Sequence, residues 1–522
     1  MLRPHEHTVP TVWTAERLRT AVANSFGNES IVVLANREPF QHDRTADGGV
    51  RVKRSSGGLV TALEPLIQAC AGVWVAHGSG TADRSVVDGR DRLLVPPANP
   101  SYRLRRVWLN AAEERGYYGG FSNEGLWPLC HRAHVQPIFR GEDFALYETV
   151  NARFADAVCE EVNSHSPLVL VQDYHFALAP QAIRDRLPLS TIVTFWHIPW
   201  PAPRDYAGCP WASQLLEGLL GSSIVGFQTQ SDCEKFLDSV EFLLGAEIDR
   251  RRQAVAWEDR WVTVKAYPVS VEWPSQGARS SPPVVACRAD VRGQLALPPD
   301  IHLVVGVDRL DYTKGLEEKV RVVERLLERQ PGFRKRVVLA QIAEPSRTRL
   351  PAYQAYRSRL METVRRVNSR FGSHDYCPIA LLESHHDPAD VYRFLRAADV
   401  CYVGSLHDGM NLVAKEFVAA RDDHRGVLML STFTGAAREL SAAQLIDPCA
   451  IDDCADALAN ALQMPDEEQA AAIRAMRAIV AEANSHRWAG EMIADAGRRR
   501  VRSAQSLGCH RTVRQQELGT WV

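Results

Sequence analysis

The chain has 522 residues, of which 45% are hydrophobic and 24% charged, a composition typical of a globular enzyme rather than of a disordered or membrane protein. This length exceeds what a single hydrophobic core usually supports, so two domains are expected. Lys and Arg number 61 against 63 Asp and Glu, and the net charge of −2 excludes a global field that would recruit nucleic acid.

The sequence also bears on location and cofactors. No apolar run approaches the roughly eighteen residues that span a bilayer, and the N-terminal residues lack the features of a secretion signal. The eleven cysteines are scattered without a CxxC pair, which argues against a zinc site or a disulfide framework. We therefore expect a cytoplasmic protein with no membrane partner, no bound metal and no cofactor.

Short apolar runs alternate with helical patterns along most of the chain. Two series of strands are predicted, at 31–35, 168–171, 191–196 and 224–227, and then at 302–307, 337–342, 399–403 and 427–430. Amphipathic stretches predict helices at 231–244, 315–329 and 351–371. Near-continuous apolar strands that alternate with helices indicate parallel sheets covered on both faces.

A polar, Pro- and Ser-rich stretch at 272–283 separates the two series and predicts a domain boundary. We expect two facing, doubly wound Rossmann-like α/β domains, at 29–272 and 284–498, with the active site in the cleft between them. The last helix is expected to pack back on the first domain, and the basic tail at 499–522 to be disordered. The first 28 residues give no functional signal.

Ligands of doubly wound sheets bind outside the carboxyl ends of the strands. Polar side chains follow five of the predicted strands there: Arg37, Asp173, His197, Arg309 and Asp408. The alternative for a single residue such as His197 is a core histidine with no function.

The loop and helix that follow the 399–403 strand carry the strongest signal. Asp408 lies in the loop, and a helix is predicted from about Asn411, whose free N–H groups would suit a phosphate. Glu416 lies five residues further on, about 7–8 Å at 1.5 Å per residue, which is the gap between the diphosphate and the ribose of a nucleotide sugar. Asp408 would then hold a sugar, the Leu412 and Val413 amides a diphosphate, and Glu416 a ribose. Alternatively, Asp408 is only a cap and Glu416 a solvated surface residue.

Arg309 and Lys314 lie five apart where a strand gives way to a helix. A guanidinium fork together with a point charge suits a diphosphate. The alternative is a surface pair neutralised by Asp308 and Asp311. Gly58, in a glycine pair before a helical stretch, would let the backbone approach a phosphate or would form an ordinary turn.

These motifs, in this order and spacing, resemble those of the trehalose-6-phosphate synthases, a family of retaining glycosyltransferases with two facing Rossmann-like domains of the GT-B type. The resemblance covers roughly residues 31–496. Its motifs are Asn36-Arg37, Gly57-Gly58, Tyr118, Trp127-Pro128, Asp173-Tyr174-His175, His197-Ile198-Pro199, Gly226-Phe227-Gln228-Thr229, Arg309-Leu310-Asp311 with Lys314-Gly315, Ser346-Arg347, and Asp408-Gly409-Met410-Asn411 through Glu416.

The resemblance implies a role for each of these residues. Donor binding would use Gly58, Arg309, Lys314, Asn411, Leu412, Val413 and Glu416. The catalytic set would be Arg309, Lys314, Asp408 and His197, of which Asp408 and His197 hold hydroxyls of the donor glucose. A glucose 6-phosphate pocket would be formed by Arg37, Tyr118, Trp127, Asp173 and Arg347.

The implied reaction moves glucose from a nucleoside diphosphate glucose, with UDP-glucose as the family's usual donor, to glucose 6-phosphate, giving trehalose 6-phosphate with retention and without a metal. The partners would be these two substrates, and whether the protein forms a homo-oligomer stays open. His77 and His407 depart from the common family pattern, in which tryptophan and arginine stand at these places. Alternatives are another phosphorylated acceptor, such as glycerol 3-phosphate or a cyclitol phosphate, or a non-catalytic regulator that binds sugar phosphate.

Overall fold

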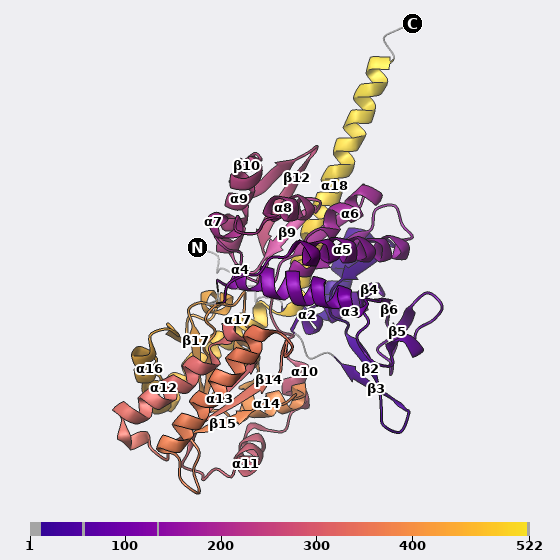
Figure 1. Cartoon of the computed structure of the whole chain (residues 1–522). Coiled ribbons are helices and arrows are strands. Elements are labelled where there is room, and N and C mark those ends of the chain that lie inside the picture. Colours follow the sequence, from indigo (N-terminus) through magenta and orange to yellow (C-terminus); the bar gives the residue numbers. More distant parts are fainter. Residues whose placement is uncertain (1–11, 55–57, 133–134, 519–522) are drawn as a thin grey trace, which may run out of the picture. The chain divides into compact units, whose positions relative to one another are not determined.

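The structure, a computed structural model, describes residues 12–54, 58–132 and 135–518 (Figure 1). These residues form two compact units. Unit 1 contains residues 268–485 together with the segment 123–138, and unit 2 contains residues 13–122, 139–267 and those from 486 on. Each unit has its own sheet, so the two are taken in turn.

The sheet of unit 1 has six parallel strands in the order β15-β14-β13-β16-β17-β18. This is the 3-2-1-4-5-6 order of a Rossmann fold, whose switch point lies between β13 and β16. The strands are β13 (His302–Arg309), β14 (Val337–Glu344), β15 (Ile379–Leu382), β16 (Val400–Val403), β17 (Val427–Ser431) and β18 (Gln444–Ile446).

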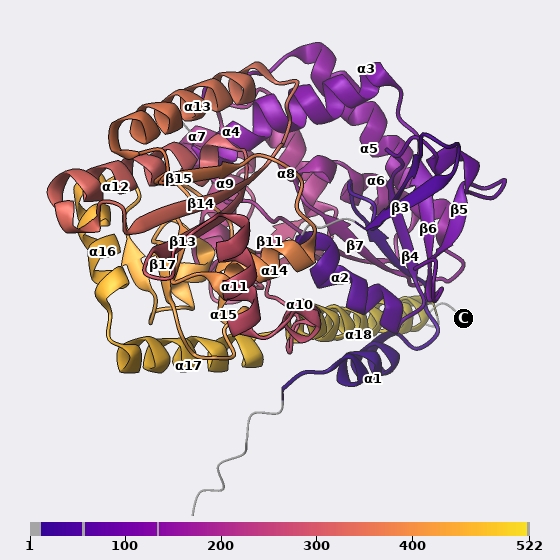
Figure 2. The same cartoon turned by 90° about the horizontal axis from the view of Figure 1, so that it is seen from below.

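Helices cover both faces of this sheet. In α12, the buried Leu316, Val320, Val323 and Leu327 follow the i, i+4, i+7, i+11 spacing of one helix face. α12 packs on α13 and α16, and α14 packs on α11 and α15, in two groups on either side of the strands (Figure 2). The helical elements of unit 1 are α4 (Trp127–His131), α10 (Gln276–Ser280), α11 (Val284–Gln294), η4 (Tyr312–Lys314), α12 (Leu316–Arg329), η5 (Pro331–Phe333), α13 (Pro351–Phe371), α14 (Pro388–Ala397), α15 (Leu412–Ala420), η6 (Gly435–Arg438), α16 (Ile451–Gln463) and α17 (Asp466–Glu482).

The sheet of unit 2 has ten strands in the order β10-β11-β12-β9-β8-β7-β1-β4-β6-β5. Its central strands are parallel, and the antiparallel pairs β10–β11, β11–β12 and β5–β6 lie at its two edges. The switch point lies between β1 and β7. The strands are β1 (Ile31–Leu34), β4 (Val73–His77), β5 (Arg92–Val95), β6 (Tyr102–Val107), β7 (Leu168–Gln172), β8 (Thr191–Phe195), β9 (Ile224–Phe227), β10 (Ile248–Asp249), β11 (Ala254–Trp257) and β12 (Arg260–Ala266), with β2 (Phe40–Arg44) and β3 (Val50–Arg54) in a separate hairpin.

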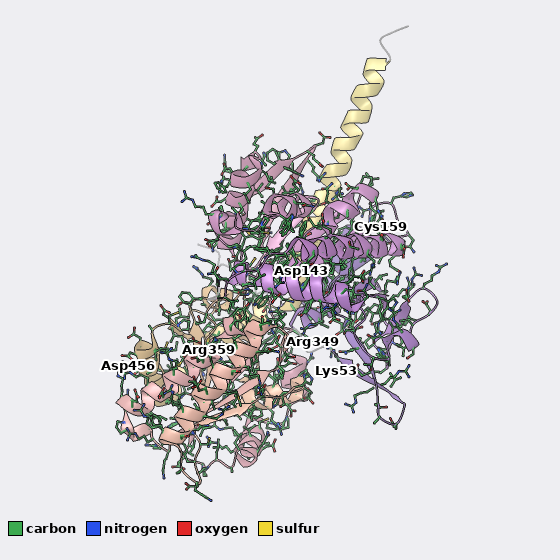
Figure 3. The ribbon with its side chains drawn as sticks, viewed as in Figure 1. Lys53, Asp143, Cys159, Arg349, Arg359 and Asp456 are labelled. Carbon is green, nitrogen blue, oxygen red and sulfur yellow. The ribbon has the colours of Figure 1, made fainter. Side chains whose placement is uncertain are left out.

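The helices of unit 2 include a long π-helical stretch, η2, which passes into unit 1. A Cβ at Gly120 of η2 would collide with the Asp143 carboxylate of α5, so this close approach requires glycine (Asp143 is labelled in Figure 3). The helical elements are α1 (Ala15–Phe26), α2 (Gly58–Ala69), η1 (Asp83–Ser85), α3 (Ala111–Glu113), η2 (Glu114–Leu126), α5 (Gly141–Glu161), η3 (Tyr174–Phe176), α6 (Ala179–Arg186), α7 (Pro203–Tyr206), α8 (Ala212–Leu220), α9 (Gln230–Leu244) and α18 (Ser485–Leu518).

The core confirms the predicted parallel sheets. Every residue of β1, β7, β8 and β9 in unit 2, and of β16 and β17 in unit 1, is buried. Strands buried on both faces explain why the sequence reads as continuous apolar runs. The eight predicted strands and three predicted helices are all present, with ends shifted by at most two residues. Among the described residues, no helix is both long enough and apolar enough to cross a membrane.

The chain changes units earlier than the Pro- and Ser-rich stretch indicates. Unit 1 resumes at Pro268, and the stretch at 272–283 lies inside unit 1 and contains α10. Lys415 Nζ donates a hydrogen bond of 2.9 Å to the Val269 carbonyl, and the Ser485 amide donates one of 2.9 Å to the Val271 carbonyl. These bonds anchor residues 269–271 in unit 1 before the stretch begins.

The last helix groups with unit 2 and lies beside α1 (Figure 2). Trp488 Nε1 donates to the Tyr267 carbonyl at 3.1 Å, and Lys265 Nζ pairs with Asp495 at 2.6 Å. The sequence predicts a disordered tail from residue 499, whereas the structure continues α18 to Leu518. Residues 499–518 contain no proline and one glycine, so no residue there stops the helix.

Candidate functional site

Both sheets place predicted site residues at their switch points. In unit 1, Arg309 is the last residue of β13, and Asp408 follows the adjacent β16. In unit 2, Arg37 follows β1, Asp173 follows the adjacent β7, and His197 follows β8. The carboxyl ends of neighbouring parallel strands share one sheet edge, so each unit brings its set together.

Lys314 and Asp408 form an ion pair in unit 1. Lys314 Nζ lies 2.5 Å from Asp408 Oδ2, which also accepts hydrogen bonds from Ser405 Oγ at 3.2 Å and Asn411 Nδ2 at 3.1 Å. Burial would raise the pKa of Asp408, but the Lys314 ammonium lowers it below its usual value. The Asp408 carboxylate is therefore charged, and its position is fixed by three donors.

Asn411 caps the helix α15. Its Oδ1 accepts from the Ala414 amide at 3.2 Å, and its backbone has a φ of 74°, in the left-handed region that non-glycine residues rarely adopt. Leu412 and Val413, the first two residues of the helix, are half-buried. A helix start of this kind orients N–H groups toward an anion.

Glu416 lies on the second turn of α15 and is half-buried. Burial raises the pKa of its carboxyl group to about 7. No donor among the described residues hydrogen-bonds to this carboxylate. The group is therefore not the solvated surface residue of the alternative interpretation.

Two arginines share one buried carboxylate in unit 1. Asp311 Oδ2 lies 3.6 Å from Arg309 Nη2 and 3.2 Å from Arg347 Nη1, and it accepts from Tyr353 Oη at 3.1 Å. Burial would raise the pKa of Asp311, but the two guanidinium groups lower it to about 2. Arg309 and Arg347 are thus held side by side by a charged counter-ion, while Asp308 pairs with Lys319 instead.

Trp127 lies against this arginine pair. The Arg347 guanidinium carbon is 4.0 Å from the centre of the Trp127 ring, and that of Arg309 is 5.2 Å away. The His131 ring packs on Trp127 with 4.0 Å between ring centres. Trp127, which the family resemblance places in the glucose 6-phosphate pocket, therefore also supports the guanidinium groups beside it.

In unit 2, Asp173 and His197 are joined through the backbone. Asp173 has a φ of 71°, and its Oδ1 accepts from the Tyr174 amide at 3.0 Å and the His197 amide at 3.1 Å. His197 Nε2 lies 2.9 Å from the side-chain oxygen of Gln172, and burial lowers the pKa of His197 to about 3. The imidazole is neutral, donates through Nε2, and leaves Nδ1 as an acceptor.

The segment that carries Arg37 is fixed through its neighbours. Trp74 Nε1 donates to the Arg37 carbonyl at 3.2 Å, and Tyr117 Oη donates to Asn36 Oδ1 at 2.9 Å. The Arg37 side chain is exposed. Tyr118, on η2, stacks on His175 with 5.7 Å between ring centres. Because its backbone is fixed and its guanidinium group is exposed, Arg37 is suited to bind an anion from solution.

Two further predicted residues of unit 2 are His77 and Gly58. His77 ends β4, with Nδ1 3.1 Å from the Val107 carbonyl, and burial lowers its pKa. Gly58 is the first residue of α2, while its neighbour Gly57 lies outside the described residues. Within the described ranges, no group of three or more His, Cys, Asp or Glu side chains is arranged to hold a metal ion.

The structure adds residues to which the sequence assigned no role in the site. The sequence indicates Asp311 only as a neutralising partner, yet it holds both arginines; its place inside the Arg309-to-Lys314 motif is the available signal. His131, four residues after Trp127 on the same short helix, had no signal beyond that i, i+4 spacing. Three of the site residues, Asp173, Arg347 and Asn411, have positive φ values, a strain that clusters at functional sites.

Two Rossmann-like units, each with site residues at the switch point of its sheet, are the architecture of the GT-B glycosyltransferases. The chain belongs to glycosyltransferase family 20, whose model matches residues 29–498. A trehalose-6-phosphate synthase of Mycobacterium avium is 38% identical over 473 residues, which cover 89% of this chain and 94% of the relative. One of Mycolicibacterium vanbaalenii is 39% identical over 471 residues, covering 89% and 95%.

Solved structures of the same kind match. The trehalose 6-phosphate synthase of Burkholderia multivorans has a TM-score of 0.81 at 32% identity, covering 92% of this chain and 98% of its own. The Burkholderia xenovorans enzyme in complex with glucose-6-phosphate has a TM-score of 0.79 at 31% identity, covering 90% and 99%. The E. coli protein bound with UDP-2-fluoro glucose has a TM-score of 0.78 at 30% identity, covering 90% and 99%. The predicted family and fold class are confirmed.

Proposed function

We propose that this protein is a retaining glucosyltransferase that moves glucose from UDP-glucose to glucose 6-phosphate and forms trehalose 6-phosphate. The observation that carries the proposal is the switch point of unit 1, where the Lys314–Asp408 pair lies beside the start of α15. The relatives support the same substrates, because their names describe UDP-forming trehalose-phosphate synthases and complexes with UDP-2-fluoro glucose and glucose-6-phosphate.

The donor is assigned mainly to unit 1. Arg309 and Lys314 bind the diphosphate together with the Leu412 and Val413 amides, and Glu416 accepts from the ribose. Asn411 keeps the first turn of α15 in place through its cap. Asp408 accepts from hydroxyls of the glucose.

In unit 2, His197 and Gly58 are proposed as donor-binding residues. The neutral His197 ring accepts a hydrogen bond from a glucose hydroxyl at Nδ1, because its Nε2 donates to Gln172. The backbone at Gly58, the first turn of α2, is assigned to the donor phosphates.

Acceptor-binding residues are proposed in each unit separately. In unit 2, Arg37 is assigned to the phosphate of glucose 6-phosphate, and Tyr118 and Asp173 to the acceptor sugar. In unit 1, Arg347 is assigned to the phosphate, and Trp127 orients its guanidinium. A planar guanidinium binds a phosphate dianion with two hydrogen bonds, which neutral side chains do not provide.

The proposed reaction transfers glucose in one step, and negative charge develops on the leaving diphosphate. The bond from the anomeric carbon to the diphosphate oxygen breaks, and the acceptor hydroxyl oxygen bonds to that carbon from the same face, so the configuration is retained. The hydroxyl proton passes to the leaving diphosphate. A double displacement would need a carboxylate nucleophile, and Asp408 is instead held by Lys314, Ser405 and Asn411. Arg309 and Lys314 stabilise the negative charge that develops on the diphosphate.

A donor-by-acceptor matrix tests the proposal. The purified chain is incubated with UDP-, GDP- or ADP-glucose and with glucose 6-phosphate, glycerol 3-phosphate or a cyclitol phosphate, and nucleotide release and products are measured. We expect UDP-glucose with glucose 6-phosphate to give the highest kcat/KM. A preference for glycerol 3-phosphate would contradict the acceptor assignment, and absence of nucleotide release from every pair would favour a sugar-phosphate-binding regulator.

We also infer a cytoplasmic location. The ten cysteines whose side chains the structure describes are free thiols, as a reducing compartment would keep them. Non-reducing mass spectrometry of the protein from its host cells would contradict this inference if it found disulfides.

A further inference from the structure

The short helix α4 ends against the loop that carries Asp408. α4 spans Trp127–His131, and Arg132 after it adopts a left-handed φ of 47°. Carbonyl groups in the last turn of a helix lack partners within the helix. The His131 carbonyl accepts a hydrogen bond of 2.8 Å from Nδ1 of His407, the residue immediately before Asp408. His407 thus ties the end of α4 to the β16–α15 loop.

His131 continues this connection toward Trp127. Its side chain is 2% exposed, and its Nδ1 lies 2.9 Å from the Trp127 carbonyl, to which it donates. Its ring meets the His407 ring edge-on, with 6.2 Å between centres, and packs on the Trp127 ring at 4.0 Å. Burial, followed by the nearby His407, lowers the pKa of His131 to about 3, so the ring stays neutral at physiological pH.

The contacts extend to the arginine pair, because Arg347 lies 4.0 Å over the Trp127 ring. All four side chains belong to unit 1. The result is a continuous column, His407–His131–Trp127–Arg347, hereafter the histidine column. At one end it adjoins Asp408, and at the other it orients Arg347.

We infer that His407 and His131 are positioning residues. They keep the loop that carries Asp408 in a fixed position relative to the stacked side chains of Trp127 and Arg347. The inference rests on the proposed function, in which Asp408 binds the donor glucose and Arg347 the acceptor phosphate. Neither histidine needs to touch a substrate. A displacement of one end relative to the other would misalign the acceptor hydroxyl and the anomeric carbon, and small misalignments of this kind reduce turnover strongly.

Apart from Arg309, whose guanidinium carbon lies 5.2 Å from the centre of the Trp127 ring, the residues assigned to the nucleotide lie outside the histidine column. Among the described residues, Lys314, the start of α15 and Glu416 form no hydrogen bond and no ring contact with His407 or His131. Loss of the column is therefore expected to change transfer to the acceptor while leaving nucleotide binding in place. A merely structural role would weaken both.

The test compares two replacements of His407. His407→Ala removes the donor to the His131 carbonyl, whereas His407→Asn keeps an amide N–H at a position close to Nδ1. We expect His407→Ala to lower kcat/KM for glucose 6-phosphate by about 3- to 10-fold, the effect of one hydrogen bond, with the Kd of UDP unchanged and with recovery in His407→Asn. The exposed His374, mutated to Ala, serves as the control. Parent-like kinetics in His407→Ala, or an equal loss in the Asn variant, would overturn the inference.

A second readout separates this inference from the proposed function. If the parent chain fails to turn over UDP-glucose with glucose 6-phosphate, the proposed function fails, and hydrogen–deuterium exchange then decides the inference. Exchange in residues 127–131 should rise in His407→Ala and stay at the parent level in His407→Asn. Unchanged exchange in the Ala variant would show that His407 does not hold α4.

Discussion

The switch points of the two units differ in how their polar groups are held, although the strand order around them is the same. In unit 1, the charged groups are already paired: Lys314 with Asp408, and Arg309 and Arg347 with Asp311. In unit 2, Asp173 is held by backbone amides, His197 by a neutral amide oxygen, and Arg37 is exposed. One topology thus provides an ionic site in one unit and a largely neutral hydrogen-bonding site in the other.

The difference suits the two kinds of ligand group. A diphosphate carries charge that increases as it leaves, and fixed cations stabilise it without reorganisation. Sugar hydroxyls are neutral, and they need donors and acceptors of defined direction, which the strained backbone at Asp173 and the single tautomer of His197 provide. The predictions that follow alter one side of this comparison at a time.

The largest effect is expected at the cations of unit 1. Arg309→Ala removes a charge that acts on the leaving diphosphate, so kcat should fall by about 10²- to 10³-fold, as for other fixed donors to developing charge. Arg357, exposed on α13 and paired with Glu383, is the matched control, and Arg357→Ala should retain parent turnover. Steady-state kinetics with saturating donor measure the effect. Parent-like kcat in Arg309→Ala would remove the basis for the donor assignment.

The next effect is expected at the exposed cation of unit 2. Arg37→Ala removes a charge-assisted contact with the acceptor phosphate, and the KM for glucose 6-phosphate should rise by roughly 10- to 100-fold. The Kd of UDP should stay constant, because Arg37 is not assigned to the donor. Arg37→Lys keeps the charge but not the planar fork, so it should recover only part of the loss.

Arg51→Ala, on the exposed strand β3, controls for the loss of a surface charge in the same unit. If the affinity for UDP falls as much as the affinity for glucose 6-phosphate in Arg37→Ala, the assignment of Arg37 to the acceptor alone is wrong.

The sequence predicted the strands beside the two switch points better than it predicted the contacts between the site side chains. β1, β7, β13 and β16 were found because strands buried on both faces leave an unbroken apolar run. Their order in the sheet, and hence the switch points, followed only from the structure. Short edge strands such as β10 and β18, which are partly exposed, lack that pattern.

The site shows the same limit. Residues that end a strand or directly follow one, such as Arg309 and Asp173, could be located from the sequence. Their partners could not, because pairing depends on segments that are distant along the chain. Trp127 and His131 belong to a segment, 123–138, that packs with residues beyond 268, and no local pattern reveals this.

A smaller effect is expected on stability at the turn after Lys314. Gly315 has a φ of 65°, and a Cβ there would collide with the Gly404 carbonyl oxygen. Gly245, which ends α9, has a φ of 63° with open space around it. Gly245→Ala should cost only the left-handed strain, about 1–2 kcal/mol, whereas Gly315→Ala adds the collision and should lower Tm further. Equal Tm values in calorimetry would show that the loop at Gly404 yields freely.

The pH dependence of donor binding is expected at Glu416. Its pKa is raised to about 7 by burial, so the carboxyl group is protonated below that pH and ionised above it. The ionised form accepts ribose hydroxyls better, and the affinity for UDP-glucose should rise by about 3- to 10-fold as pH rises through 7. His131 and His197, with pKa values near 3, do not titrate in this range.

Glu416→Gln should remove this dependence in calorimetric titrations at pH 6 and 8. Stability without ligand should change in the opposite direction. A raised carboxyl pKa contributes stability that is complete below the unfolded value of 4.5 and is lost as pH rises through about 7. The Gln variant should lack that component, and a parent-like pH slope in Glu416→Gln would assign the titration to another group.

Removal of divalent metal ions is expected to have the smallest effect. In the proposed mechanism, Arg309, Lys314 and the start of α15 take the place that a divalent cation holds beside the diphosphate in metal-dependent enzymes. Turnover in EDTA should therefore equal turnover in magnesium, both in the parent and in Arg357→Ala. The sharper comparison uses Lys314→Ala. If added magnesium or manganese partly restores the kcat of this variant and leaves that of the parent unchanged, the Lys314 ammonium group and the metal ion stabilise the same negative charge on the diphosphate. Complete loss of parent activity in EDTA, restored by magnesium, would mean that the cations of unit 1 do not suffice and that the contrast between the two switch points has to be explained differently.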